Sequence, residues 1–324
     1  MIIKERQKPE YIQQLEALLR RLSPNHPKRE SIETELGKHL AGHRGEESIE
    51  FYLSELPFEN FFLLHNVRLA IHEDHFIQLD TIILTSHFIV ILEVKNLTGK
   101  LMFDPTFHQL IREKDGVEEV FPDPILQINR QRRLFQQWLE FNKFPQLPIE
   151  SFIVISNPST LIRSTVPNHE ISGRVFHSAF LPDKMEAIRK RYSKGHLPNK
   201  DVKKLANILK KKNRPLIKDV LAAFQLSKAE ILTGVQCPGC LYLPMQRQNG
   251  QWICSSCSVS NKTAHLQGIH DYFLLFQKPL TNEELRSFLH ISSRHVSRRL
   301  LLSAQLERKG QKKYRTYTIP TNRE

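Results

Sequence analysis

Two carboxylates and a lysine fall on consecutive segments whose composition is that of buried strands. Asp80 lies in one apolar run, and Glu93 and Lys95 lie in the next. Residues two apart on a strand point to the same side of a sheet, so Glu93 and Lys95 are expected to project together. If the two runs pair as a hairpin around residues 85–87, Asp80 lies across the ladder from Glu93.

A patch with these three groups has the chemistry that phosphodiester hydrolysis requires. Carboxylate oxygens hold Mg²⁺, which keeps several waters and binds phosphate oxygens. The metal supplies hydroxide and stabilises developing negative charge, while a lysine positions or deprotonates the attacking water. The alternative is an ion pair at a strand end with Asp80 in a turn, because an Asp…Glu-x-Lys pattern also arises by chance.

The four cysteines form two C-x2-C pairs separated by 13 residues. They are Cys237, Cys240, Cys254 and Cys257. Thiolates at this spacing close a tetrahedral Zn²⁺ site, and four protein ligands leave no open position for a substrate. We therefore predict a structural zinc ribbon, in which the metal folds a module with a small core of its own. The alternatives are a redox dithiol and a rubredoxin-like iron site.

The elements that must position the acidic residues follow an α/β order. Apolar residues at helical spacing predict helices over 9–22, 29–56 (interrupted or kinked near 42–45) and 124–141. Runs rich in Val, Ile, Leu and Phe predict strands over 61–70, 76–85, 87–95, 100–103, 108–112, 151–156 and 173–177. Helix, antiparallel strands, helix and strand is the order of an α/β sandwich.

Four short motifs occur in order within this region. They are Arg44-Gly-Glu-Glu-Ser-Ile-Glu-Phe-Tyr-Leu, Gln78-Leu-Asp-Thr-Ile-Ile-Leu, Ile91-Leu-Glu-Val-Lys-Asn-Leu-Thr-Gly and Asp123-Pro-Ile-Leu-Gln-Ile-Asn-Arg-Gln. Together they resemble the nuclease-related domain known as NERD, a branch of the PD-(D/E)XK superfamily, over roughly residues 37–160. The sequence departs from the family pattern at Leu79, where Pro is common, and at Asp123, which replaces the usual Asn.

The resemblance implies a restriction-endonuclease-like α/β core and a set of site residues. The implied catalytic residues are Lys95, Glu93, Asp80, Glu46 and Gln127. Asp80 and Glu93 are the expected ligands of Mg²⁺ or Mn²⁺, and Lys95 is expected to assist the attacking water. Glu47 is the alternative to Glu46 as the helix carboxylate. Glu46 and Gln127 also fit the simpler interpretation of solvated helix residues.

The charge is distributed unevenly along the chain. The formal net charge is +13, yet residues 1–172 have a net charge of −5 and residues 173–324 a net charge of +18. A strongly basic half joined to a mildly acidic half predicts a region that binds nucleic acid. The alternative is a basic surface that only contacts solvent.

The basic C-terminal segment has the pattern of a helix-turn-helix with a wing. Thr281 and Glu284 have the spacing of a capping box at the start of one helix, and a second helix is expected to begin at Ser292 or Ser293. Residues 306–319 predict a two-stranded wing. The basic residues expected to face phosphates are Lys309, Lys312, Lys313 and Arg315. A small helical domain that contacts protein is the alternative.

These expectations divide the chain into five parts. They are an N-terminal helical segment (1–36), a NERD-like nuclease domain (37–180), a basic helical linker region (181–232), a four-Cys zinc ribbon (233–265) and a winged-helix-like module (266–324). The expected function is metal-dependent hydrolysis of phosphodiester bonds in DNA, with nucleic acid bound by the C-terminal half. A non-catalytic DNA-binding protein and a protein-interaction module built on the zinc ribbon are the alternatives.

The chain is expected to be cytoplasmic and to have no membrane partner. The N-terminus lacks the apolar segment of a signal peptide, and no apolar run approaches the roughly 20 residues that span a bilayer. The sequence does not distinguish DNA from RNA, and it does not give the oligomeric state.

Overall fold

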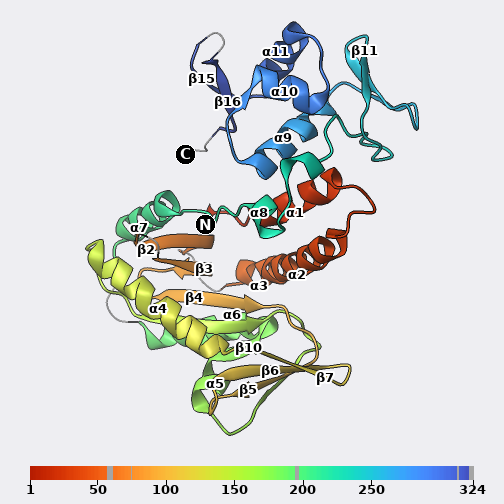
Figure 1. Ribbon diagram of the computed structural model, residues 1–324. Coiled ribbons are helices and arrows are strands. Elements are labelled where there is room, and N and C mark those ends of the chain that lie inside the picture. Colours follow the sequence, from red (N-terminus) through yellow and green to blue (C-terminus); the bar gives the residue numbers. More distant parts are fainter. Residues whose placement is uncertain (57–60, 74, 194–196, 312–313, 321–324) are drawn as a thin grey trace. The chain divides into compact units, whose positions relative to one another are not determined.

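The computed structural model describes residues 1–56, 61–73, 75–193, 197–311 and 314–320 (Figure 1). Contacts divide the chain into two compact units. The first contains Met1–Gln7 and His39–Leu216, and the second contains Lys8–Lys38 and Ile217–Glu324. Both units mix helices with sheets, so the predicted α/β class is confirmed. Among the described residues, no helix combines the length and apolar character needed to cross a membrane.

A mixed sheet forms the centre of the first unit. Its strand order is β1 (Ile2–Lys4), β2 (Phe62–His72), β3 (His75–Leu84), β4 (Ile89–Lys95), β8 (Ile149–Ile155) and β10 (Val175–His177). The pairs β2–β3 and β3–β4 are antiparallel, whereas β1–β2, β4–β8 and β8–β10 are parallel. Strand β4 is almost entirely buried because helices cover both of its faces, which explains its unbroken apolar run.

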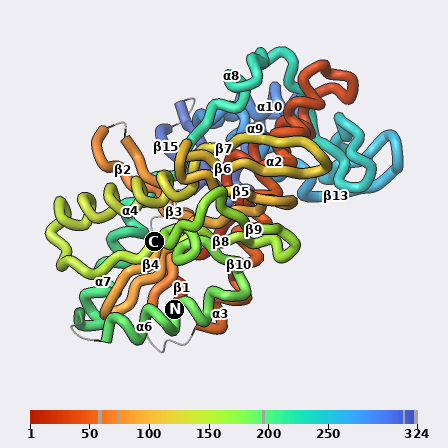
Figure 2. The backbone as a smooth tube through the Cα atoms, turned by 90° about the horizontal axis from the view of Figure 1, so that it is seen from below, coloured from red at the N-terminus to blue at the C-terminus, as the bar shows by residue number. Residues whose placement is uncertain are grey.

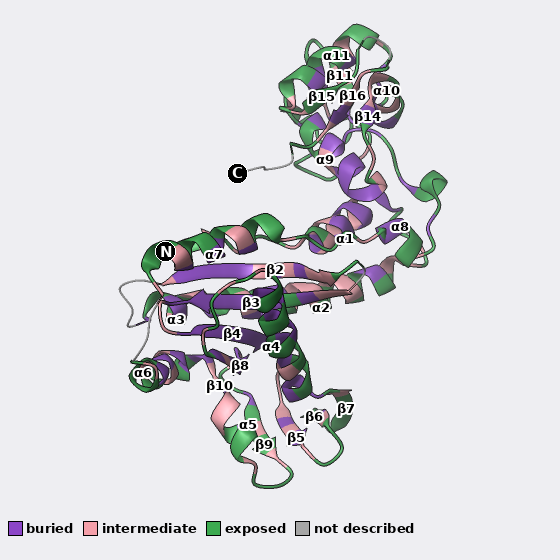
Figure 3. Cartoon of the chain, turned by 90° about the vertical axis from the view of Figure 1, so that its left-hand side faces the viewer, coloured by how far each residue is buried: buried purple, intermediate pink, exposed green. Residues whose placement is uncertain are grey.

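Helices on the two faces of this sheet bury its apolar residues (Figure 3). One face packs against α4 (Pro124–Phe141) and α7 (Asn199–Lys212), and the other packs against α3 (Glu50–Ser54) and α6 (Leu181–Arg191). The start of α4 is fixed by Asp123, whose carboxylate accepts a 2.8 Å hydrogen bond from the Ile125 N–H. Odd- and even-numbered residues of β4 therefore face different helices, and Glu93 and Lys95 share the side of α4.

The helix before β2 corrects one expectation. The interruption predicted at residues 42–45 is wrong, because α2 (Arg29–Ser48) continues through both glycines. The helix ends only before Ile49, and α3 begins at Glu50. A glycine inside a helix costs only about 1 kcal/mol relative to alanine, so tertiary packing overrides it. At Gly45 the packing is specific, since a Cβ there would lie 2.3 Å from Cβ of Asn96 at the end of β4. The glycine lets α2 approach the strand that carries Glu93 and Lys95.

A smaller sheet extends the first unit (Figure 2). Its strand order is β7 (Val117–Pro122), β6 (Gln109–Lys114), β5 (Lys100–Asp104) and β9 (Leu161–Ser164), and α5 (His169–Arg174) follows β9 in the chain. The composition of residues 117–122 and 161–164 does not predict strands, because β7 is largely exposed and β9 is short. Both strands are defined by their pairing with β6 and β5.

The second unit contains two small sheets and a group of helices. Helices α1 (Glu10–Arg21), α8 (Val220–Ala223) and α9 (His265–Phe276) share one hydrophobic core. Strands β11 (Gln246–Gln248), β12 (Gln251–Ile253) and β13 (Ser260–Asn261) form the first sheet. The fully buried pair Arg21 and Asp271, 2.8 Å apart, links α1 to α9.

The C-terminal part of the second unit has winged-helix topology. After α9 come β14 (Leu280–Thr281), α10 (Asn282–Leu289), α11 (Arg294–Ser303), β15 (Glu307–Lys309) and β16 (Thr316–Thr318). The sheet order is β14, β16, β15, as in a wing that folds back beside the second helix. The capping box of Thr281 and Glu284 and the start of the second helix after Ser293 are both confirmed.

Candidate active site and metal centre

The position of Asp80 follows from an irregularity in β3. Ile77, Leu79 and Ile82 all belong to the core beneath α4, although Leu79 and Ile82 are three residues apart. The alternation of side chains between the two faces of the sheet is therefore displaced by one residue near Asp80. Asn66, between the residues of β2 that pair on either side of Asp80, has a left-handed φ of 49°.

The ladder between β3 and β4 also stops at this point. Its last pair is Thr81 with Leu92, so Asp80 lies across from Glu93, as the predicted hairpin requires. The backbone N–H of Val94 donates to Oδ2 of Asp80 at 3.0 Å instead of pairing with a strand carbonyl. The two strands diverge here, and the buried Asp80 carboxylate occupies the opening.

Glu93 is held by a network that α4 completes. Lys95 Nζ donates to Glu93 Oε1 at 2.7 Å and to Gln127 Oε1 at 3.0 Å. Gln127 Nε2 donates to the same Glu93 oxygen at 2.7 Å, and Gln131 Nε2 donates to Glu93 Oε2 at 2.8 Å. Gln127 and Gln131 are four residues apart and so share one face of α4. The structure thus brings Glu93, Lys95 and Gln127 into direct contact.

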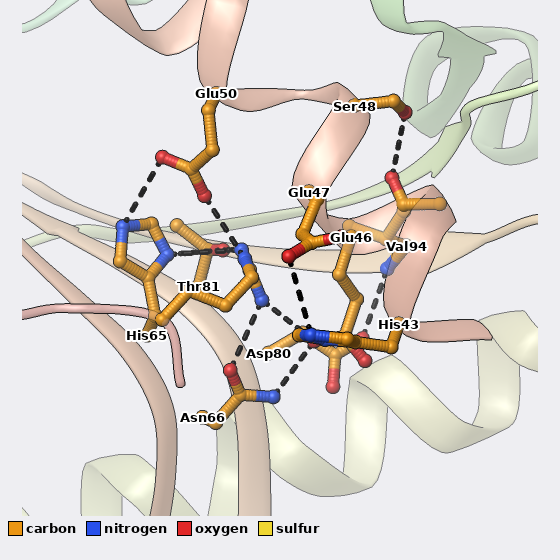
Figure 4. Close-up of polar contacts among 12 residues, drawn as sticks. His43, Glu46, Glu47, Ser48, Glu50, His65, Asn66, Asp80, Thr81 and Val94 are labelled. Atoms are coloured by element: carbon orange, nitrogen blue, oxygen red, sulfur yellow. Dashed lines mark hydrogen bonds and ion pairs between the residues drawn. The ribbon is translucent and has the colours of Figure 1, made fainter. Parts of the chain in front are cut away.

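Glu46 approaches the same region from α2 (Figure 4). Its Oε2 accepts from Arg6 Nη1 at 2.6 Å and from Asn66 Nδ2 at 2.7 Å. The neighbouring Glu47 instead lies 3.2 Å from His43 Nε2, and its side chain is 55% exposed. Of the two candidate positions, Glu46 is therefore the one directed towards Asp80.

Burial and neighbouring charge both act on Asp80. Burial raises the pKa of its carboxyl well above the ordinary value, and the negative charges of Glu93 and then Glu46 raise it further. The Val94 N–H and the Lys95 ammonium oppose the shift. Burial and two neighbouring carboxylates thus disfavour the negative charge of Asp80, and a divalent cation beside it would offset that charge.

The acidic residues offer oxygen donors, which Mg²⁺ and Mn²⁺ prefer. In the present arrangement Glu93 is bound by Lys95 and Glu46 by Arg6. Within the part of the chain that the structure describes, the cysteines are the one group of metal-binding side chains with all ligand atoms within 4.8 Å of one another. The carboxylates of Asp80, Glu93 and Glu46 therefore fit such a cation in donor type and charge. Their oxygens are spaced more widely than the sulfurs of the cysteine cluster.

The four cysteines form a compact cluster, and all four are free thiols. The Sγ atoms of Cys237 and Cys257 are 3.6 Å apart, and those of Cys240 and Cys254 are 3.5 Å apart. Four sulfurs around one Zn²⁺ at about 2.3 Å lie roughly 3.8 Å from one another. The Gly239 N–H also points at Cys237 Sγ, at 3.4 Å. The cluster, beside the sheet of β11, β12 and β13, is consistent with a zinc ribbon.

Comparison with known proteins finds a family match within the first unit. Residues 41–156 match the model of the nuclease-related domain family. This segment is similar to the nuclease-related domain. It runs from α2 to the end of β8 and contains Glu46, Asp80, Glu93, Lys95 and Gln127, so the resemblance carried by the four motifs is confirmed. No curated protein and no solved structure matches the chain.

The sequence did not reveal that the N-terminal segment belongs to this site. Arg6 follows β1 and is almost fully buried, with contacts to Glu46 and to Glu50 at 2.6 and 2.9 Å. Lys4 donates to the carbonyl of His65 at 2.7 Å. Isolated basic residues near a chain end have no local pattern that predicts such contacts. Gln131 was also not predicted from the sequence, although its position four residues after Gln127 on a predicted helix was a signal that could have identified it.

The basic residues around His65 determine its charge state. Burial, with Arg6 and then Lys4, lowers the pKa of His65 to about 3. Burial, with Arg6, likewise lowers the pKa of Lys4 to about 8. His65 is therefore a neutral ring at physiological pH, and its Nδ1 lies 2.9 Å from Arg6 Nη2. This ring and Glu50 fix the guanidinium that faces Glu46.

The winged-helix module presents a basic surface on α11. Arg294, His295, Arg298 and Arg299 are exposed there, as is Lys309 on β15. Arg315 is half-buried. The expected phosphate contacts of Lys312 and Lys313 lie outside the described residues.

Proposed function

We propose that the nuclease-related domain hydrolyses phosphodiester bonds in DNA with Mg²⁺ or Mn²⁺, and that the second unit binds nucleic acid. The observation that carries the proposal is the contact of Lys95 with Glu93 and Gln127 beside the buried carboxylate of Asp80. A structural ion pair does not account for this arrangement, because the Asp80 carboxyl stays destabilised by its acidic neighbours.

In this proposal each acidic residue has a distinct task. Asp80 and Glu93 hold the cation, and Glu46 is the further carboxylate directed towards them from α2. A bound Mg²⁺ supplies a water of lowered pKa and neutralises charge on the phosphate. Val94 orients Asp80 through its backbone N–H, and Gln131 orients Glu93 through its amide. Both contacts fix the carboxylates before a substrate arrives.

Lys95 is the group nearest the reacting atoms in this scheme. Its side chain is 24% exposed, whereas that of Glu93 is only 6% exposed, so the ammonium lies between the carboxylate and solvent. An ammonium in this place donates a hydrogen bond to the attacking water or to a phosphate oxygen and offsets developing charge. Gln127 accepts one Lys95 hydrogen and so keeps the ammonium on the side of Glu93.

The second unit supports nucleic-acid binding through the exposed arginines of α11. A winged helix places its second helix against the DNA groove and its wing against the backbone. Arg294 and Arg298 are four residues apart and share one face of α11, which suits adjacent phosphates or base edges. Binding through several phosphates should weaken steeply as salt rises.

Cleavage of labelled single-stranded, duplex and branched DNA tests the proposal. Wild type, Asp80→Ala and Lys95→Ala are compared with and without added Mg²⁺ or Mn²⁺. Lys100→Ala is the matched control, because Lys100 follows Lys95 closely and pairs with Glu113 on the smaller sheet. The proposal predicts metal-dependent cutting by wild type and the control, with cutting lost in both site variants. Equal cutting by all four proteins would assign the activity elsewhere.

A further inference from the structure

A pocket of about 470 Å³ lies in the first unit, away from the acidic residues, and is lined by residues at the ends of β2, α4 and α7. Trp138 contributes a buried wall, and its ring stacks on Phe144 with 6.1 Å between centroids. Phe141 also lines the pocket, yet its side chain is 87% exposed. Two exposed cations, Lys212 and Arg214, complete this part of the lining. The pocket thus combines an exposed aromatic ring with two positive charges, the pair of side-chain types that binds single-stranded nucleic acid.

Helix α4 connects this pocket to the candidate active site. Gln127, Arg130, Arg133, Gln137 and Phe141 are all exposed. At 100° per residue these positions fall within one stripe about 120° wide along the helix. The stripe begins at the residue that contacts Lys95 and ends at the pocket, 14 residues further on. At 1.5 Å per residue, this is a path of about 21 Å.

The hairpin end of β2 and β3 continues the same surface. Arg130 Nη2 lies 2.7 Å from His75 Nε2, and His75 pairs with His72, which lines the pocket. The guanidinium of Arg130 is therefore held along the path. Together with Arg133, Lys212 and Arg214, it gives the path four positive charges.

These features match a strand of nucleic acid more closely than a peptide. Positive side chains follow a phosphate backbone, and exposed aromatic rings stack on bases regardless of their identity. The pocket volume falls in the range of sites that enclose small ring systems. A base within a duplex is stacked on both faces, so only an unpaired or terminal base can enter beside Phe141.

We infer that the pocket binds an unpaired nucleobase of a strand whose phosphate backbone runs along the exposed face of α4 to Lys95. The inference rests on the proposed function, because it takes the occupant to be the substrate of that site. The 21 Å path corresponds to about six nucleotides at the 3.4 Å spacing of a stacked strand, and to fewer in an extended strand. The substrate class is accordingly nucleic acid with a single-stranded segment close to the bond that is cut.

Binding to an uncleaved strand tests the pocket independently of catalysis. The full chain carrying Asp80→Ala is titrated with a labelled oligothymidylate and with a strand of equal length that has a phosphodeoxyribose backbone without bases. The same titrations use Phe141→Ala in that background. Phe107→Ala is the matched control, since Phe107 is 76% exposed on the turn between β5 and β6. A thymidylate strand with photoreactive 4-thiothymidine residues then locates the contacts by mass spectrometry.

The pocket predicts that Phe141→Ala weakens binding of the thymidylate strand roughly tenfold, the usual scale of one lost stacking contact. Binding of the strand without bases should be unchanged, and crosslinks should map to the ends of β2 and α4. The inference is overturned if Phe141→Ala and Phe107→Ala bind both strands equally and crosslinks lie elsewhere. The binding test requires no cleavage, so it can succeed even if the nuclease assay finds no activity. If the pocket does not bind a base, metal-dependent cleavage can still be observed.

Discussion

The two candidate metal sites of this chain differ in what surrounds them. The acidic residues lie within a large sheet whose faces are covered by helices, and cationic side chains already contact Glu93 and Glu46. The four thiols lie beside strands of only two or three residues. In the first site the sheet and its helices position the ligands, whereas in the second Cys237 and Cys254 reach the hydrophobic core and Cys240 and Cys257 are exposed. Under the proposed function, the difference predicts a catalytic ion at the acidic residues and a structural ion at the thiols.

Removal of the cysteine ligands should produce the largest effect. Structural zinc contributes on the order of 10–16 kcal/mol of apparent binding free energy, which a module with such short strands cannot replace. Cys237→Ser with Cys254→Ser, or treatment with a strong chelator, should expose the second unit to protease and leave the nuclease-related domain resistant. Metal content and limited proteolysis with peptide mapping measure both. If the two units were equally resistant to protease after complete zinc loss, the cysteine site would not be needed to stabilise the second unit.

Asp80→Asn should separate stability from activity. The substitution removes a buried carboxylate that Glu93 and Glu46 repel, so cleavage should be lost while the unfolding free energy of the metal-free protein rises. Activity assays and urea unfolding at neutral pH check the two effects. Loss of both stability and activity would show that Asp80 is a structural residue.

The stability of the metal-free protein should fall as pH rises, in agreement with the raised pKa of Asp80. Because the folded pKa of Asp80 is raised above the unfolded value, its destabilising effect is absent below the unfolded pKa and grows as pH rises towards the folded pKa. Wild type should therefore lose stability relative to Asp80→Asn over that interval. Unfolding curves of the two proteins across the acidic to neutral range provide the test, and parallel curves would contradict the assigned shift.

Arg6→Gln should have an intermediate effect on catalysis. Without the guanidinium, Glu46 and Glu50 lose their ion pairs, and Glu46 is no longer held beside Asp80. We expect roughly a tenfold loss in kcat, as for a misplaced supporting group. Lys8→Gln is the control, since Lys8 is exposed and pairs with Glu16. An Arg6→Gln enzyme as active as the control would assign Glu46 no part in the site.

Arg298→Gln on α11 should have the smallest effect. Loss of one phosphate contact reduces the slope of log affinity against log salt by about 1 and leaves cleavage chemistry unchanged. Fluorescence anisotropy over a salt series, with wild type beside the variant, measures the slope. An unchanged slope of log affinity against log salt would indicate that nucleic acid does not bind to this face of α11.

Local patterns predicted the parts of the fold that depend on local physics. The apolar run of β4, the helix that begins at Pro124, and the capping box at Thr281 each express burial or helix-end chemistry within a few residues. The pairing of Glu93 with Lys95 followed from the two-residue period of a strand.

Features that depend on distant contacts were not accessible in this way. The shift at Asp80 requires the left-handed Asn66 on the neighbouring strand, and Arg6 reaches Glu46 across 40 residues of chain. The continuation of α2 through Gly45 reflects its close approach to Asn96. In each case a tertiary contact overrode or supplemented the local preference.

Lys95 is proposed to act with Asp80 and Glu93 in metal-dependent phosphodiester cleavage. The most direct measurement compares the single-turnover cleavage rate of wild type, Lys95→Ala and Lys100→Ala on one labelled strand across a Mn²⁺ titration. We predict a metal-dependent rate for wild type and Lys100→Ala, and a rate at least 100-fold lower for Lys95→Ala, the scale of a lost acid–base group. A Lys95→Ala rate equal to that of Lys100→Ala at every metal concentration would contradict the account.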